Sequence, residues 1–366
     1  MSPDHLKQDR LHVATRKGLM IYQRNAAGWA HLRTAFAGSP VSLSLVSSDG
    51  RTVFAALNLG HFGTKLHRSD DGGATWTELA PPAFPKVESA DEKEKAPAVV
   101  GIWSLAWAGP GKLWCGTAPG GLFHSADNGA SWSLNEGLWN HPERKRWFGG
   151  GTVDPALHSI LVDPRDSKKV AVAVSCGGVW RTADGGKTWT VGAQGMVARF
   201  MPPDLQNDPS IQDPHMVVQC ASSPDVYWCQ HHNGIFRSTD GLDSWHEITT
   251  APVSSFGFAV AVHPKDPNTA WFVPAHSDQD RIPVDGKVLV TRTTDGGKTF
   301  SELRAGLPQE NAFDLVYRHG LTIDGSGSRL AMGSTTGSLW VSENGGEGWQ
   351  LLSAHLPPVY AVQFAA

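Results

Sequence analysis

Residues 182–189 read Thr-Ala-Asp-Gly-Gly-Lys-Thr-Trp, and this short pattern occurs six times along the chain. Each copy has Ser or Thr, then Asp or Asn two residues later, and Trp or Phe five residues after that. Gly lies two residues after the Asp in five copies. The copies are Ser69-Asp71-Gly73-Trp76, Ser125-Asp127-Gly129-Trp132, Thr182-Asp184-Gly186-Trp189, Ser238-Asp240-Trp245, Thr293-Asp295-Gly297-Phe300 and Ser342-Asn344-Gly346-Trp349. The Asp or Asn lies at 71, 127, 184, 240, 295 and 344, so the intervals are 56, 57, 56, 55 and 49 residues. Such regular spacing indicates a repeat architecture.

Each copy is predicted to be a fastened turn. The Asp or Asn side chain can accept hydrogen bonds from the turn backbone, and Gly can adopt a conformation that other residues resist. The aromatic residue can fill the space between neighbouring sheets. The carboxylate of Asp184 and its equivalents is therefore expected to be structural.

These motifs resemble the Asp-box (BNR) repeat of sialidases, sortilin-type receptors, photosystem assembly factors and some glycoside hydrolases, and the resemblance covers nearly the whole chain. It implies a β-propeller in which each box joins the third and outermost strands of a blade, away from the ligand. It also implies that the loops after the second and outermost strands share the face where the central channel opens.

The rest of each repeat reads as short strands. In residues 158–181, two apolar runs flank the turn Asp163-Pro164-Arg165-Asp166, as in a hairpin. Residues 11–32 supply only three strands, and residues 358–364 supply a fourth, so the C-terminal strand is expected to close the ring. We predict an all-β, seven-bladed propeller in a single domain, residues 1–366. Its blades are expected at approximately 11–32 plus 357–365, 41–80, 99–135, 154–192, 214–249, 255–304 and 312–353.

Composition narrows the functional classes. The formal net charge is −4, and the chain lacks a strong Lys/Arg cluster, which argues against nucleic acid as the main partner. No apolar run of about 18 residues occurs, so neither a signal peptide nor a membrane partner is expected, and the default location is cytoplasmic. The four cysteines have no CxxC spacing, which favours reduced thiols.

Comparing the blades with one another reveals candidate site residues. His231 and His232 occupy slots where other blades carry small residues, such as Ala118 and Pro119. The matching loop of the next blade is expanded over residues 274–283. We predict a His-rich site at the channel mouth with the catalytic residues His231, His232, His276, Asp278 and Asp280. Substrate contacts are expected from Asn58, His61, Trp147, Arg199, Asn233 and Arg281. Loops on a rigid scaffold are where binding groups gather.

The clustered imidazoles also suggest a divalent metal, Zn²⁺ or Mn²⁺, because imidazole nitrogen is a good ligand for both ions. The expected ligands are His61, His158, His215, His231 and His276, with His232 as a further candidate. Asp278 or Asp280 would assist as a ligand or as a partner of an imidazole. The alternative is a metal-free pocket in which the same histidines act as acids, bases or hydrogen-bond donors.

Three functions remain open. Sialidase activity is disfavoured, because the sialidase-like Arg281-Ile282-Pro283 lies far along the chain and the Tyr and Glu nucleophile pair is missing. A carbohydrate-active enzyme is favoured, either a hydrolase with paired carboxylates or a metal-assisted lyase. Its ligand would be a small molecule or a saccharide. If the ligand is anionic, Arg281 would bind its charged group. A non-enzymatic binding or assembly propeller is the alternative.

Overall fold

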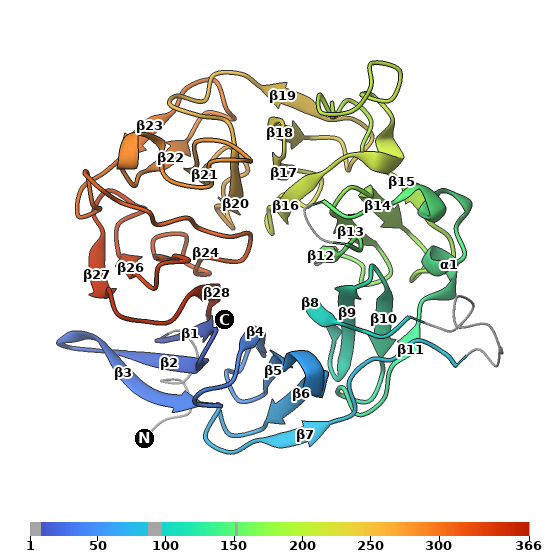
Figure 1. Ribbon diagram of the computed structural model, residues 1–366, viewed down its shortest axis with the longest axis horizontal. Coiled ribbons are helices and arrows are strands. Elements are labelled where there is room, and N and C mark those ends of the chain that lie inside the picture. Colours follow the sequence, from blue (N-terminus) through green and yellow to red (C-terminus); the bar gives the residue numbers. More distant parts are fainter. Residues whose placement is uncertain (1–8, 87–96, 151–152, 366) are drawn as a thin grey trace.

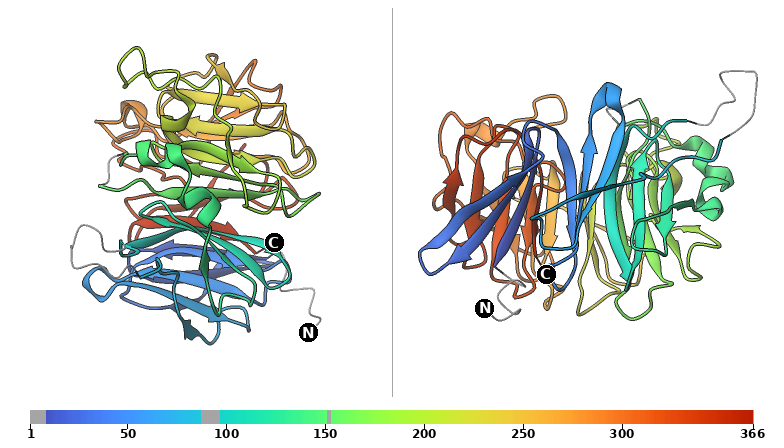
Figure 2. Two further views of the ribbon diagram at one scale, coloured as in Figure 1. Left: turned by 90° about the vertical axis from the view of Figure 1, so that its right-hand side faces the viewer. Right: turned by 90° about the horizontal axis from the view of Figure 1, so that it is seen from below.

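Seven four-stranded antiparallel sheets stand around a central axis as the blades of a propeller (Figure 1). The computed structural model describes residues 9–86, 97–150 and 153–365. In every blade one strand lies beside the axis and the others follow outward, and the edge-on views show the sheets packed face to face (Figure 2). The prediction of an all-β, seven-bladed propeller is confirmed.

The first six blades each use four consecutive strands. Blade 1 contains β4 (Val41–Val46), β5 (Val53–Asn58), β6 (Thr64–Ser69) and β7 (Thr77–Leu79); blade 2 contains β8 (Gly101–Gly109), β9 (Lys112–Ala118), β10 (Leu122–Ser125) and β11 (Ser133–Leu134); blade 3 contains β12 (Leu157–Val162), β13 (Val170–Val174), β14 (Gly178–Thr182) and β15 (Thr190–Val191). Blade 4 contains β16 (Pro214–Gln219), β17 (Tyr227–His231), β18 (Gly234–Ser238) and β19 (His246–Ile248); blade 5 contains β20 (Gly257–Val262), β21 (Ala270–Pro274), β22 (Val290–Thr293) and β23 (Ser301–Leu303); blade 6 contains β24 (Leu321–Ile323), β25 (Leu330–Gly333), β26 (Leu339–Ser342) and β27 (Gln350–Ser353).

The helical segments are short and lie in the loops. They are η2 (Gly60–Phe62), α1 (Glu136–Trp139), η4 (Pro142–Arg146), η5 (Pro209–Ile211) and η6 (Val284–Gly286). Within the described ranges, none of them has the length and apolar content needed to cross a membrane. The four cysteines are buried free thiols, as the spacing predicted.

The recurring motif forms the predicted turn between the third and outermost strands. In blade 3, between β14 and β15, Thr182 Oγ1 donates to Asp184 Oδ1 at 2.7 Å and accepts from the Gly186 amide at 3.0 Å. Asp184 Oδ1 also accepts from the Thr188 amide at 3.0 Å. Gly186 has a φ of +89°, which a side chain would resist. Hydrogen bonds from the Thr188 hydroxyl and amide and from the Thr182 hydroxyl lower the pKa of Asp184, as expected for a structural carboxylate.

The aromatic residue of the motif joins neighbouring blades. Trp189 is 4% exposed and belongs to a buried cluster with Trp114 of blade 2 and Trp180 of blade 3. Its Nε1 donates to Asn135 Oδ1 at 2.9 Å, and Asn135 directly follows β11. Each turn therefore fastens its own blade and supplies a side chain that packs against the preceding one.

The last blade joins the two ends of the chain. It contains β28 (Val359–Phe364), β1 (Arg10–Thr15), β2 (Gly18–Asn25) and β3 (Gly28–Ala35), in that order from the axis outward. β28 pairs with β1, placing Leu11 opposite Phe364 and Val13 opposite Val362. The predicted closure by the C-terminal strand is confirmed. We call this sheet the closing blade.

The closing blade lacks the fastened turn. Its β2 and β3 are joined by a tight turn between Asn25 and Gly28. Arg24 and Trp29, which occupy the Asp and Trp slots, instead donate to Glu343 Oε1 of blade 6, at 3.2 and 2.8 Å. Blade 6 is thereby linked to the closing blade.

A β-bulge recurs near the start of the innermost strand in six blades. In blade 3, Leu157 pairs with Val174 and Ser159 pairs with Ala173, which leaves His158 without an opposite residue. The residues displaced in this way are Ser42, Trp103, His158, His215 and Tyr360, together with Phe258 and Ala259 in blade 5. Because a bulge re-aims the extra side chain, strand alternation alone does not predict which way these side chains face.

Deleting residues 357–366 should abolish cooperative folding, because it removes the innermost strand of the closing blade and exposes the inner edge of β1. Calorimetric melting of the full-length and truncated chains measures the effect. A truncated chain that melts in one transition at the temperature of the full-length protein would contradict this topology.

Asp184→Ala should lower the melting temperature by a few degrees, because the turn loses the acceptor for Thr182 and Thr188. Asp184→Asn should lower it less, since Asn344 serves in the same position of blade 6, where its Oδ1 accepts from the Gly348 amide. Lys187→Ala is the control, because Lys187 takes part in the turn through its backbone amide. An alanine variant that melts at the temperature of the wild-type protein would show that the Asp184 side chain does not hold the turn.

Candidate functional site

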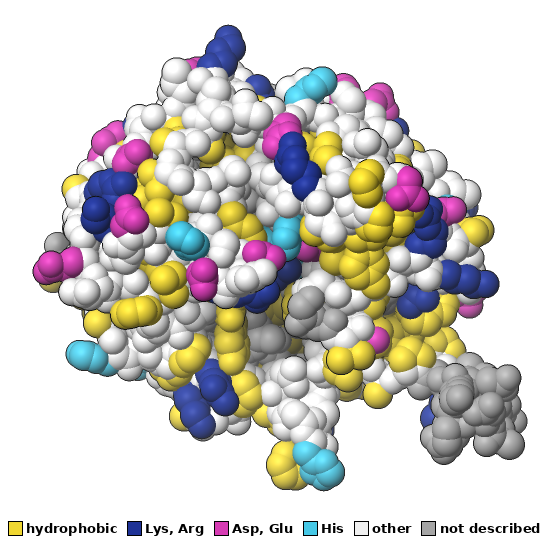
Figure 3. Space-filling view, turned by 45° about the horizontal axis from the view of Figure 1, so that its top comes forward, with side chains coloured by type: hydrophobic (Ala, Val, Ile, Leu, Met, Phe, Trp, Pro, Cys, Tyr) yellow, Lys and Arg dark blue, Asp and Glu magenta, His cyan; other side chains and the backbone are white. Residues whose placement is uncertain are grey.

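A pocket of about 890 Å³ opens at one end of the central axis, and every blade contributes to its lining. We call it the axial pocket. The space-filling view shows a hollow where cationic, acidic and imidazole side chains gather (Figure 3). Its lining includes Ser42, Trp103, Cys176, Asp213, His215, His232, Phe258, Asp278, Arg281, Tyr317, Arg318, His319, Tyr360 and Arg16. Five of these residues lie at the bulges of their blades: Ser42, Trp103, His215, Phe258 and Tyr360.

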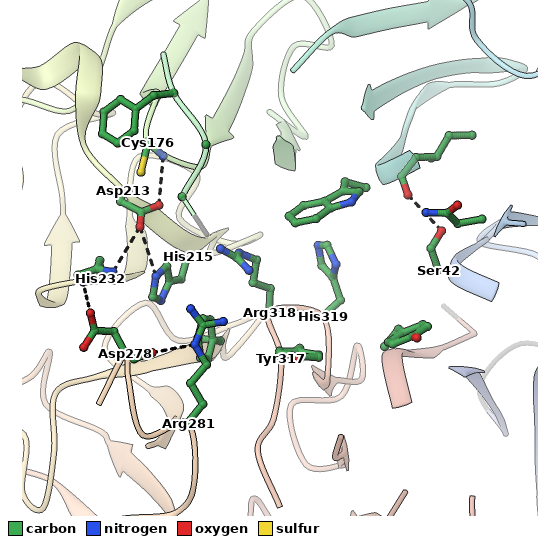
Figure 4. A pocket seen from close by; sticks show the side chains of 18 of the residues that line it. Ser42, Cys176, Asp213, His215, His232, Asp278, Arg281, Tyr317, Arg318 and His319 are labelled. Atoms are coloured by element: carbon green, nitrogen blue, oxygen red, sulfur yellow. Dashed lines mark hydrogen bonds and ion pairs between the residues drawn. The ribbon is translucent and has the colours of Figure 1, made fainter. Parts of the chain in front are cut away.

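Asp213 is the buried acidic group of the pocket and directly precedes β16. Its Oδ1 accepts a hydrogen bond from the Cys176 amide of blade 3 at 3.1 Å. Its Oδ2 faces two imidazoles, with His215 Nε2 at 3.5 Å and His232 Nδ1 at 3.4 Å (Figure 4). Burial acts to raise the pKa of Asp213, but the contacts with the two histidines and the charge of Arg318 hold it well below the usual range.

His215 is held from both sides. Its Nδ1 lies 2.6 Å from the carbonyl oxygen of Gly257, and its ring stacks on Phe258 with a centroid distance of 4.5 Å. The carbonyl can only accept, so Nδ1 carries the hydrogen and Nε2 faces Asp213. Burial lowers the pKa of His215, against the opposing effect of Asp213.

His232 lies between two carboxylates at the edge of the pocket. Its side chain is 21% exposed, and its Nε2 lies 3.7 Å from Asp278 Oδ2 of blade 5. Phe200 and Phe256 contact the ring edge-on, at centroid distances of 4.8 and 5.8 Å. The imidazole is thus placed by aromatic contacts while both ring nitrogens face acidic oxygen atoms.

Arg318 brings a positive charge into the centre of the pocket. It precedes β24, and its Nη2 donates to Ser175 Oγ of blade 3 at 3.3 Å. Its guanidinium lies over Trp103 and Phe258, at 5.6 and 5.5 Å from the ring centroids. The buried Nε has no hydrogen-bond partner among the residues that the structure describes. Burial lowers the pKa of Arg318, although Asp213 acts to raise it.

His319, the residue after Arg318, links blade 6 to blade 3 across the axis. His319 Nε2 lies 2.9 Å from the carbonyl oxygen of His158 on blade 3. On its other side, His319 forms a parallel bridge to Ala361 of β28, where the Val362 amide donates to the His319 carbonyl at 2.8 Å. Blades 3 and 6 and the closing blade therefore meet beneath the pocket.

The structure brings together five of the predicted site residues. Asn58, His215, His232, Asp278 and Arg281 all line the axial pocket. Arg281 lies 5.4 Å from the ring centroid of Phe258, and its Nε donates to the Asp278 carbonyl at 2.9 Å.

The other predicted histidines do not line the pocket. His231 is fully buried beside Phe236, and its ring nitrogens lie 3.1 and 3.0 Å from the backbone amides of Asp213 and Asn233, so its ring faces the backbone and not the pocket. His158 is also fully buried, because the bulge turns its ring onto Ser159 Oγ at 2.9 Å. His61 and His276 are exposed on loops, outside the pocket lining.

Four further predicted residues are also elsewhere. Trp147 is 8% exposed and packs edge-on against Trp180 in the core. Arg199 Nη2 pairs with Glu247 at 2.6 Å, and its amide donates to Asn233 Oδ1 at 2.7 Å, so both side chains fasten the 199–205 loop. Asp280 is exposed outside the lining. Position on a loop therefore did not by itself predict which side chains reach the pocket.

Comparing loops after the second strands missed Asp213, Arg318, His319 and Trp103. The sequence position of these residues could have identified them, because each lies at or just before the start of an innermost strand, as do the predicted His158 and His215. The same position in blade 6 reads Tyr317-Arg318-His319.

The predicted metal ligands do not converge as a set, since only His215 of the five belongs to a group with suitable geometry. That group is Asp213, His215 and His232, whose potential ligand atoms all lie within 4.8 Å of one another. His232, first assigned as catalytic, is thus the second imidazole of this cluster.

Comparison with known proteins supports the fold. No protein-family model matches the chain. A xyloglucanase from Hypocrea jecorina (strain QM6a) is 25% identical over 258 residues, which cover 64% of this chain and 26% of that enzyme. The chain therefore spans about a quarter of the length of this relative.

Two solved structures illustrate the range of similar folds. The GH74 xyloglucanase from Xanthomonas campestris aligns with a TM-score of 0.63 at 16% identity, covering 100% of this chain and 53% of that one. YCF48 bound to a D1 peptide aligns with a TM-score of 0.52 at 15% identity, covering 86% and 83%. At these identities the matches show a shared fold, and the chain is a seven-bladed β-propeller with xyloglucanase-like structural neighbours.

Proposed function

We propose that the axial pocket binds an anionic saccharide and cleaves it beside its carboxylate. The observation that carries this proposal is Arg318, which lines the pocket, donates to Ser175 Oγ and makes no ion pair with a carboxylate among the residues that the structure describes. Three arginines line the pocket, Arg16, Arg281 and Arg318, against the two carboxylates Asp213 and Asp278. Since both carboxylates already face imidazoles, an anionic ligand would complete the charge balance.

The aromatic lining supports a saccharide as the ligand. Trp103, Tyr317 and Tyr360 border the same space as Arg318 and offer flat apolar faces beside polar groups. The similarity to a xyloglucanase points to the same ligand class. Sugar rings have apolar faces and polar edges, which suits such a lining.

Among cleavage reactions, we favour elimination over two-carboxylate hydrolysis. Hydrolysis of that kind needs two carboxylates that both reach the substrate, whereas Asp213 is 4% exposed and its oxygen atoms already face the Cys176 amide and two imidazoles. In an elimination, a base takes the proton from the carbon beside the carboxylate and the carbon–oxygen bond to the leaving sugar breaks. The leaving oxygen then receives a proton. Asp278 and Tyr317 line the pocket and can accept and return these protons.

Binding of matched oligosaccharides tests the proposal. We expect an oligogalacturonide to bind at least tenfold more tightly than the neutral oligogalactoside, and Arg318→Gln to remove this preference, because a charge-assisted pair contributes about 1.5 to 3 kcal/mol. Isothermal titration calorimetry measures both affinities, and ultraviolet absorption of an unsaturated product distinguishes elimination from hydrolysis.

Arg199→Gln is the control, because Arg199 lies outside the pocket in an exposed pair with Glu247 and should leave binding unchanged. Correct folding of each variant is checked by its melting temperature. The proposal fails if the wild-type protein binds neither oligosaccharide, or if Arg318→Gln keeps the preference for the acidic one.

A protein-binding propeller is the second candidate, favoured by two exposed phenylalanines. Phe62 is 78% exposed and Phe313 is 63% exposed, and both lie on segments that reach the pocket lining at Gly60 and Tyr317. A similar fold, YCF48, is solved with a bound peptide. If this function holds, replacing Phe62 or Phe313 by serine should weaken partner binding without affecting any saccharide affinity.

A further inference from the structure

Three side chains at the wall of the axial pocket have the arrangement of metal ligands. Asp213 Oδ2 lies 3.5 Å from His215 Nε2 and 3.4 Å from His232 Nδ1 (Figure 4). Both distances exceed the usual hydrogen-bond range of about 2.7 to 3.2 Å. Ligand atoms about 2.1 Å from a tetrahedral ion are roughly 3.4 Å apart, so the observed distances suit two edges of such a site.

The hydrogen on His215 is in the position that metal binding requires. Its Nδ1 lies 2.6 Å from the Gly257 carbonyl oxygen and must donate to it. In the neutral ring, Nε2 then presents a lone pair toward the carboxylate oxygen of Asp213. A cation between this lone pair and the carboxylate oxygen would be bound by both. An imidazole that donates its other N–H to a backbone carbonyl is the usual arrangement of metal-ligating histidine.

The surrounding groups hold all three ligands. The Cys176 amide donates to Asp213 Oδ1 at 3.1 Å and leaves Oδ2 for the cation. Asp278 Oδ2 lies 3.7 Å from Nε2 of His232, the ring nitrogen that does not face Asp213. Phe258 stacks on His215 and fixes its ring plane. These are the second-layer contacts that orient ligands around a metal.

The geometry points to a divalent cation site formed by Asp213, His215 and His232, with Zn²⁺ as the first candidate. Two imidazoles and one carboxylate supply three ligands, and because all three residues line the axial pocket, a water or a ligand oxygen can complete the coordination. The site also faces Arg318, so an anionic group could contact the cation and the guanidinium together. This inference does not depend on the saccharide proposal.

Metal binding by untagged, chelator-treated protein tests the site. We expect one equivalent of Zn²⁺ to bind and to raise the melting temperature, and Co²⁺ in its place to give the visible absorption of a four- or five-coordinate ion. His232→Gln and Asp213→Asn should each weaken Zn²⁺ binding at least tenfold. The His232 variant is the safer one to fold, since that side chain is partly exposed.

His276→Gln is the matched control, because it removes an exposed imidazole outside the pocket lining and should leave the affinity unchanged. The inference is overturned if the wild-type protein binds neither Zn²⁺ nor Mn²⁺, or if His232→Gln binds as tightly as the wild type. Since no saccharide is present, this result is separate from the outcome of the oligosaccharide titration.

Discussion

The pairing of β28 with β1 is the interaction on which the molecule depends. The sheet of each blade packs face to face against its two neighbours, so an open ring would leave two faces and two strand edges exposed. Once closed, the ring brings the starts of all innermost strands to one axis. The closing strand also supplies Tyr360 to the pocket, and its Val362 amide binds the His319 carbonyl beside Arg318. The strand that completes the fold therefore also fixes the backbone next to Arg318.

The fold could be predicted because its determinants are local. A fastened turn such as Thr182 to Trp189 is encoded within eight residues, and its repetition at a nearly constant interval sets the number of blades. Even the closure followed from counting strands at the two ends. The departure in the closing blade, where Arg24 and Trp29 bind Glu343 instead of forming the turn, depends on contact with blade 6 and has no local signature.

The candidate site was only partly predictable, because bulges decide which side chains reach the pocket. Strand alternation assigns a face to each residue, but an extra residue reverses that assignment locally. His158 and His215 occupy the same bulge position in adjacent blades, yet His215 lines the pocket and His158 is covered beneath it. The His158 ring lies against Ser159 Oγ, and His319 reaches across the axis to the His158 carbonyl, a contact between residues 161 positions apart that no local pattern predicts.

The two neighbouring histidines show how one short segment serves both stability and chemistry. His231 ends β17 with its ring turned into the blade, where Nε2 lies 3.1 Å from the Asp213 amide. His232 comes next, and its ring faces the carboxylate of the same aspartate. Burying that carboxylate is costly unless its surroundings compensate for lost water. His231 therefore supports the backbone of Asp213 while His232 and His215 face its oxygen atoms. This gives a physical reason why a fully buried imidazole with no access to the pocket can still matter to the site.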